Sequence, residues 1–200
     1  MKSYRQLYPQ LCSYENLKLA FKRARKRKTQ KDYVIEFETD LETNLHQLKC
    51  ELESFSYNPA PLTNFVVRDP KTRKISASHF RDRVVHHAVC NLIAPIFEKD
   101  FIFDSFANRK GKGTHPAIKR FEQFLSQSTF YHKKTKERER ERVKLGYALK
   151  ADIRHYFETV DHEILLSILK RKIKDVHVIC LIRKILDNHK TAISGFNFAQ

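Results

Sequence analysis

The chain has 200 residues, of which 41% are hydrophobic and 12% aromatic, so it is long enough to bury a core and is not disordered throughout. Lys and Arg total 39 against 23 Asp and Glu, which gives a formal net charge of +16. Such an excess favours a polyanionic partner, because each neutralised phosphate releases condensed counterions. Nucleic acid is the first candidate partner, and a membrane surface is the alternative.

Several other classes of protein are disfavoured by the same sequence. No apolar run approaches the ~20 residues of a transmembrane helix, and the amino terminus has no signal-peptide core. The four cysteines are scattered without a CxxC pair, which favours reduced thiols over a zinc site. We therefore expect a cytoplasmic protein without a membrane partner. With only 4 Gly, helices should dominate and strands should be confined to short hairpins.

The first helix is predicted from Tyr14 to about Arg25, with Ser13 as its cap. It ends in a run of basic residues: Lys22, Arg23, Arg25, Lys26, Arg27 and Lys28. Cations are favoured near a helix carboxyl terminus, so a solvated helix end explains this run. The alternative is a surface that follows nucleic-acid phosphates. Both interpretations stay open.

A second helix and a β-hairpin are predicted next. Leu and Phe recur at helical spacing from 41 to 55, and two prolines at 59 and 61 end the pattern. Residues 65–68 and 73–77 then resemble two strands joined by a turn. The cations near its tip are Arg68, Lys71, Arg73 and Lys74. They suit contacts with phosphates, although charge also protects an exposed edge hairpin from unwanted pairing.

Two further helices flank a basic loop. Apolar spacing predicts a helix from Phe80 to about Phe97, in which His86 and His87 are interpreted as structural. The loop that follows has its glycines at 111 and 113, and its cations include Arg109, Lys110 and Lys112. Its backbone amides and cations could hold an anion where the next helix begins, near Thr114. The side chains of that helix expected to face inward are Ile118, Phe121 and Leu125.

The last part of the chain places a carboxylate at the end of an apolar run. Residues 131–144 are charged and are predicted to be a solvated connection. A strand is then expected at 147–149, with Asp152 at its end and two helices from about 163 and 176. A poorly solvated carboxylate needs a hydrogen-bonding neighbour or a divalent cation. The alternative is an ordinary strand-end or helix-capping carboxylate.

Three blocks in this order resemble the amino-terminal half of reverse transcriptases of bacterial retroelements, the group II intron, retron and diversity-generating types. They are FRDRVVHHA at 80–88, FDSFANRKGKGTHPAI at 103–118 and ADIRHYFETVDH at 151–162. The resemblance covers roughly residues 60–187 and implies an RNA-directed DNA polymerase with a right-hand fold. Its partners would be an RNA template, a DNA or RNA primer and dNTPs.

The resemblance also implies roles for single residues. Asp152 would match the first catalytic aspartate, which binds both Mg²⁺ ions, and the backbone carbonyl of Ile153 would add a metal ligand. Two such ions stabilise the attacking and leaving oxygens of nucleotidyl transfer. Phe157 would match the aromatic residue that excludes a 2′-hydroxyl. Arg68 and Arg73 would match the cations that bind the triphosphate, with Lys74 and Arg109 as further candidates.

The sequence departs from the family at the second catalytic element, an aromatic-x-Asp-Asp turn. No Asp-Asp dipeptide occurs in the 200 residues, and no thumb follows. The chain looks truncated, so we expect no polymerase activity from residues 1–200 alone. A non-catalytic RNA-binding module is the alternative function.

The fold class expected is α+β: helix-rich fingers with a β-hairpin, plus the first strand and helix of a palm. The expected domains are a basic helical region at 1–58, fingers at 59–145 with a charged insertion at 131–144, and a partial palm at 146–200.

Overall fold

A computed structural model describes residues 2–127, 129–133, 140–144, 147–153 and 156–194. The chain divides into two compact units, and each is described by itself. Unit 1 comprises Met1–Lys99 and Val160–Gln200, and unit 2 comprises Asp100–Thr159. The three-part division expected from the sequence stays a prediction.

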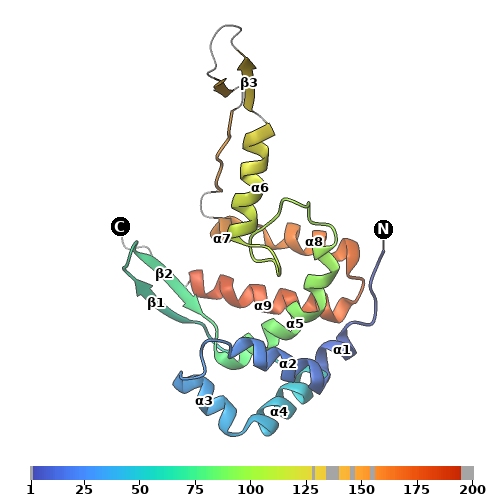
Figure 1. Cartoon of the computed structure of the whole chain (residues 1–200). Coiled ribbons are helices and arrows are strands. Elements are labelled where there is room, and N and C mark those ends of the chain that lie inside the picture. Colours follow the sequence, from blue (N-terminus) through green and yellow to red (C-terminus); the bar gives the residue numbers. More distant parts are fainter. Residues whose placement is uncertain (1, 128, 134–139, 145–146, 154–155, 195–200) are drawn as a thin grey trace. The chain divides into compact units, whose positions relative to one another are not determined.

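The described residues of unit 1 form helices and a β-hairpin (Figure 1). Its elements are α1 (Tyr8–Cys12), α2 (Tyr14–Ala24), α3 (Asp32–Thr39), α4 (Leu41–Glu53), β1 (Thr63–Val67), β2 (Arg73–Ala77), α5 (Phe80–Glu98), α8 (His162–Lys172) and α9 (Val176–Ser194). Unit 2 contains α6 (Thr114–Gln127), β3 (Thr129–Lys133), β4 (Arg140–Lys144) and α7 (Tyr156–Thr159). The α+β class is confirmed. Among the described residues, no helix is both long and apolar enough to cross a membrane.

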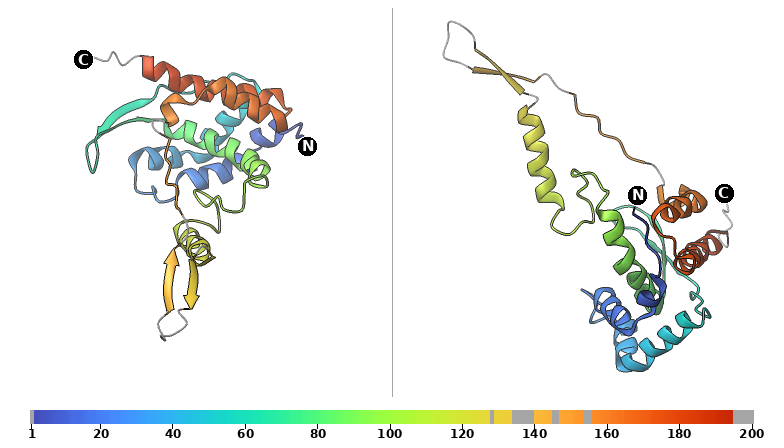
Figure 2. Two further views of the ribbon diagram at one scale, coloured as in Figure 1. Left: turned by 90° about the horizontal axis from the view of Figure 1, so that it is seen from above. Right: turned by 90° about the vertical axis from the view of Figure 1, so that its right-hand side faces the viewer.

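Helix α5 is the central element of unit 1, with α2 on one side and α9 on the other (Figures 1 and 2). Its apolar residues recur at helical spacing, and the side chains of Val84, Val85 and Ala88 are fully buried. At its start, the Phe80 ring makes edge-to-face contacts with Phe21 and Phe37, with ring centroids 6.1 Å and 5.4 Å away. This aromatic cluster joins α2 and α3 to α5.

Helices α2 and α8 begin at side-chain caps, of which the sequence predicted the Ser13 cap of α2. The Ser13 hydroxyl accepts a hydrogen bond from the Asn16 amide at 3.2 Å, and Asp161 caps α8 by accepting from the amides of Glu163 and Ile164. The helix predicted from the spacing at 41–55 is α4, and a further helix that was not predicted, α3, precedes it. The chain leaves the helical conformation at Asp40 (φ −126°, ψ 55°), where α3 ends and α4 begins.

The amino-terminal residues are joined to the segment between α8 and α9. Tyr4 pairs in parallel with Ile173 through two backbone hydrogen bonds of 2.8 Å, one to Lys172 and one from Lys174. The buried carboxylate of Asp175 accepts from the Tyr8 amide at 2.8 Å. Segments far apart in sequence therefore form one core.

Unit 2 differs from the sequence predictions at three places. The side chains of Ile118, Phe121 and Leu125 are 50%, 57% and 41% exposed, so the inward-facing side of α6 predicted from its spacing is wrong. Periodicity identifies an apolar stripe but not a layer to cover it, and no described residue of α6 is buried within the chain.

The other two differences concern strands. The charged connection at 131–144 contributes to an antiparallel hairpin, in which β3 pairs with β4. The strand expected at 147–149 is absent: residues 147–153 have no regular structure, and Tyr147 and Leu149 are fully exposed. A strand is stable only beside a partner that satisfies its backbone groups, and this segment pairs with no described residue.

Candidate nucleic-acid and nucleotide interface

The β1–β2 hairpin presents four cations that were predicted to contact phosphates, three of them for the dNTP triphosphate and Lys71 for nucleic acid. Arg68 and Lys71 lie in the connecting turn, and Arg73 and Lys74 begin β2. All four are exposed. Figures 1 and 2 show the hairpin projecting from the helices of unit 1. The hairpin therefore brings four cations together away from the core, as the sequence predicted.

The register distributes these cations over both faces of the hairpin. Val67 pairs with Arg73, and Val66 pairs with Lys74. Because successive side chains of a strand point to opposite faces, Arg73 lies on the face of Phe65 and Val67 while Lys74 lies on the other. One phosphate group bound against a single face would therefore contact Arg73 or Lys74, but not both.

The basic end of α2 forms a second cationic surface in unit 1. Lys22, Lys26 and Arg27 are exposed, and they form no ion pair among the described residues. Arg25 differs, because its guanidinium is 2.6 Å from the Glu38 carboxylate. Three members of this predicted surface thus have charges that no described carboxylate balances.

Helix α5 contributes to the same surface, which the sequence did not predict. The side chain of Arg23 donates to Asn91, and the pKa of His87 is lowered by burial and by the nearby charges of Lys28 and Arg23. His87 is therefore neutral near pH 7 and adjoins the cations. The helical spacing of His87 and Asn91 on α5 was the available signal.

In unit 2, the predicted anion-binding loop is folded around its own cations. Arg109 donates to the carbonyls of Ile102 and Ser105 at 3.3 Å and 3.2 Å, and Lys112 donates to that of Phe103. The Lys112 ammonium also lies 4.1 Å from the centre of the Phe103 ring. These contacts give Arg109 and Lys112 a role in loop structure, whereas Lys110 is exposed. Their ligand-binding roles stay predictions.

Asp152 lies in the irregular segment 147–153 of unit 2. Both Asp152 and Ile153 are exposed, so the carboxylate is solvated rather than buried at a strand end. The predicted desolvation of Asp152 is wrong for this reason. The side chain of Phe157, on α7, lies outside the described residues. Asp152 belongs to unit 2 and the β1–β2 hairpin to unit 1, so each is described by itself.

The donor set for Mg²⁺ is incomplete in the described part of the chain. Mg²⁺ prefers an octahedron of oxygen ligands, to which Asp152 and the Ile153 carbonyl would contribute two. No group of three or more His, Cys, Asp or Glu side chains that could hold a metal ion occurs among the described residues. The residues described therefore do not fit a two-ion site by themselves.

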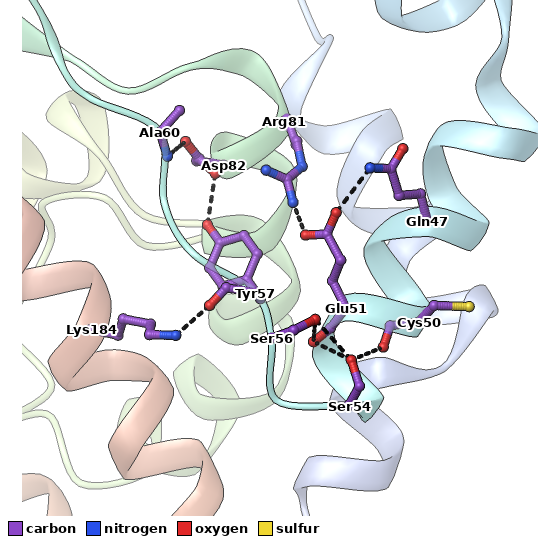
Figure 3. Close-up of polar contacts among 10 residues, drawn as sticks. All are labelled: Gln47, Cys50, Glu51, Ser54, Ser56, Tyr57, Ala60, Arg81, Asp82 and Lys184. Carbon is purple, nitrogen blue, oxygen red and sulfur yellow. Dashed lines mark hydrogen bonds and ion pairs between the residues drawn. The ribbon is translucent and has the colours of Figure 1, made fainter.

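A buried carboxylate that the sequence did not single out lies at the start of α5 (Figure 3). Asp82 is 1% exposed and accepts from the Tyr57 hydroxyl at 2.8 Å and from the Ala60 amide at 3.0 Å. Beside it, Arg81 forms an ion pair with Glu51 of α4. A charged residue between buried Phe80 and Val84 was the signal that could have identified it, because a buried charge needs partners.

Comparisons with known proteins give two distant relatives. The chain is 28% identical to protein YkfC of Escherichia coli (strain K12) over 148 residues, which are 73% of this chain and 36% of YkfC. It is 24% identical to the putative COX1/OXI3 intron 1 protein of Saccharomyces cerevisiae (strain ATCC 204508 / S288c) over 144 residues, 71% of this chain and 15% of that protein. No family model matches the chain. The chain thus has distant similarity to a protein named for an intron, and it spans about a third or less of either relative.

Proposed function

We propose that this chain is the fingers and the first palm segment of a retroelement reverse transcriptase, an RNA-directed DNA polymerase. The observation that supports this most is the projecting β1–β2 hairpin with Arg68, Lys71, Arg73 and Lys74, located directly before the FRDR block at the start of α5. The distant similarity to an intron 1 protein is consistent with a retroelement origin.

In this proposal the cations bind nucleic acid and nucleotide. The exposed cations at the end of α2 contact RNA phosphates, and the hairpin tip contacts the dNTP triphosphate through Arg68 and Arg73. RNA template, primer and dNTPs are the partners, and the cytoplasm is the proposed compartment. Arg73 and Lys74 occupy opposite faces, so a phosphate bound to one face contacts only one of them, and Arg73 is preferred because a guanidinium can bind a phosphate through two hydrogen bonds.

Asp152 and the Ile153 carbonyl would supply two of the oxygen ligands for Mg²⁺. Bound Mg²⁺ would supply charge stabilisation for nucleotidyl transfer from the dNTP to a primer 3′-hydroxyl, with pyrophosphate leaving. The remaining carboxylates must come from outside the described residues. The exposure of Asp152 leaves its carboxylate accessible to a cation.

A non-catalytic RNA-binding module is the second candidate. The incomplete donor set favours it for residues 1–200 taken alone. This function needs the cationic surfaces of unit 1 but no metal site.

Primer extension with an RNA template, dNTPs and Mg²⁺ separates the two. We expect the 200-residue chain to bind RNA without extending a primer, and a longer form that contains an aromatic-x-Asp-Asp turn to extend it. A longer form with that turn that binds RNA but never extends a primer would leave only the binding module. Absence of RNA binding by every form would exclude both functions.

A further inference from the structure

We propose that Asp82 and Arg83, neighbours in the first turn of α5, are positioning residues that fix the direction of the β1–β2 hairpin. The inference rests on the proposed function, because it concerns how the hairpin's cations are presented to their ligand. Neither residue would touch that ligand.

The hairpin cannot fix its own direction. All residues of β1 are exposed, and each strand of the two-stranded sheet has the other as its single partner among the described residues. An isolated two-stranded hairpin is marginally stable in water. Its direction must therefore be set where its strands join the rest of unit 1.

Asp82 holds the incoming chain. Residues 57–60, which we call the strap, connect α4 to β1, whose first residue is Thr63. One carboxylate oxygen of Asp82 accepts from the Tyr57 hydroxyl at 2.8 Å, and the other accepts from the Ala60 amide at 3.0 Å. Both Asp82 and Tyr57 are buried, at 1% and 2% exposed. Hydrogen bonds donated to a buried carboxylate are short-range and directional, so the strap has one position relative to α5.

Arg83 holds the outgoing chain. Its Nε donates to the carbonyl of Ser78 at 2.8 Å, and Ser78 directly follows the last residue of β2. The guanidinium of Arg83 also lies 5.1 Å from the centre of the Tyr33 ring, which restricts its rotation. Adjacent residues of one helix turn thus hold both ends of the hairpin.

Helix α9 holds the strap from its other side. Lys184 donates to the Tyr57 carbonyl, and Asn188 donates to the Ala60 carbonyl at 3.0 Å. The close-up in Figure 3 shows Tyr57 between Asp82 and Lys184. Because Tyr57 and Ala60 are both bonded to α5 and to α9, the strap connects the hairpin to the core rather than acting as a free linker.

The competing explanation is that the buried pair Asp82 and Tyr57 stabilises unit 1 as a whole and does not position the hairpin. Burial and the Asp82 carboxylate raise the pKa of the Tyr57 phenol far above its ordinary value, so it remains a donor. Removing one partner would leave a buried polar group unsatisfied and would destabilise the whole unit. Replacing both by apolar groups avoids that penalty but also removes the bond to the Ala60 amide. The double replacement therefore tests the bond to the Ala60 amide without leaving Tyr57 or Asp82 as an unsatisfied buried group.

The test compares three variants of the 200-residue chain with wild type. Tyr57→Phe with Asp82→Leu removes the polar pair, and Arg83→Met removes the bond to Ser78. Ser54→Ala is the control, because Ser54 donates to the Cys50 carbonyl of α4, and its other hydrogen bonds, with Glu51 and Ser56, lie outside residues 57–60. Amide hydrogen exchange is measured across 60–79 and across α2 and the second half of α5. Anisotropy of a labelled single-stranded RNA gives binding.

We expect the amide exchange rates across 60–79 to rise by ~10-fold or more in the Tyr57→Phe, Asp82→Leu protein and in Arg83→Met, but not in the Ser54→Ala control. The exchange rates of α2 and of the second half of α5 should stay within about twofold of wild type. The RNA dissociation constant should rise by ~10-fold, because a mobile hairpin must be ordered on binding. Equal acceleration in all segments, or unchanged exchange across 60–79, would overturn the proposal. If wild type binds no RNA, the proposed function fails, and the exchange pattern still decides whether Asp82 and Arg83 position the hairpin.

Discussion

Replacing the exposed cations at the end of α2 should weaken RNA binding in a salt-dependent manner. Lys26→Gln with Arg27→Gln removes two charges that no described carboxylate balances. Each phosphate contact with single-stranded nucleic acid contributes ~0.7 to the slope of log affinity against log salt, so two contacts contribute ~1.4. At ~0.1 M salt this corresponds to a loss of ~25-fold in affinity.

The matched control is Lys18→Gln with Lys49→Gln. These two ammonium groups lie 3.7 Å and 3.8 Å from the carboxylates of Glu42 and Glu53, so each charge is already balanced locally. Both variants lose the same net charge. Anisotropy titrations with a labelled RNA across a range of salt concentrations give the slopes, and the control slope should change by less than ~0.5.

Equal slopes for the two variants would refute this reasoning. RNA binding would then depend on net charge alone, and the end of α2 would be an ordinary solvated helix terminus.

Three further predictions concern the stability of unit 1, each measured by denaturant unfolding. Phe80→Ala should lower the free energy of unfolding by ~3–5 kcal/mol, because this 2% exposed ring fills the junction of α2, α3 and α5. Ser13→Ala should lower it by ~1 kcal/mol through loss of the α2 cap. Burial lowers the pKa of His86 in the folded chain below its value in the unfolded chain, which is ~6.5. As pH falls below ~6.5, the unfolded chain binds a proton that the folded chain does not, so the free energy of unfolding decreases. His86→Gln should therefore reduce the fall in stability between about pH 7.5 and pH 5.5.

Each of these predictions has an outcome that contradicts it. A loss under ~1 kcal/mol for Phe80→Ala would mean that the aromatic cluster is loosely packed. For Ser13→Ala, an unchanged midpoint would show that the cap is dispensable. If His86→Gln leaves the pH dependence as steep as in wild type, another group such as His87 determines it.

Local patterns predicted helices α2, α4, α5, α8 and α9 of unit 1 and the β1–β2 hairpin, but not α1 or α3. These elements depend on interactions within a short segment of the chain. Examples are the Ser13 cap of α2, the apolar spacing along α5 and the two strands that flank the basic turn. Properties that depend on distant partners were not predictable in the same way. Asp152 was expected at the end of a buried strand, but its neighbours pair with no described residue.

The same limit applies to the candidate site. The sequence identified the cations but not which face of the hairpin each occupies, because the face depends on the pairing register. It also did not reveal that Arg109 and Lys112 bond the carbonyls of their own loop. Asp82 was recognised as part of a block, but its role required the contact with Tyr57, which is remote in sequence.

The polymerase proposal is tested most directly by replacing Asp152 with Asn in a form that also contains the second carboxylate element. Primer extension on an RNA template and RNA binding are measured on the same preparation. We predict that Asp152→Asn lowers the extension rate by ~1,000-fold or more, because the ligand for the metal ions is lost, and leaves the RNA dissociation constant within about twofold. Undiminished extension, or a loss of RNA binding as large as the loss of extension, would contradict the assignment of Asp152 as a catalytic carboxylate.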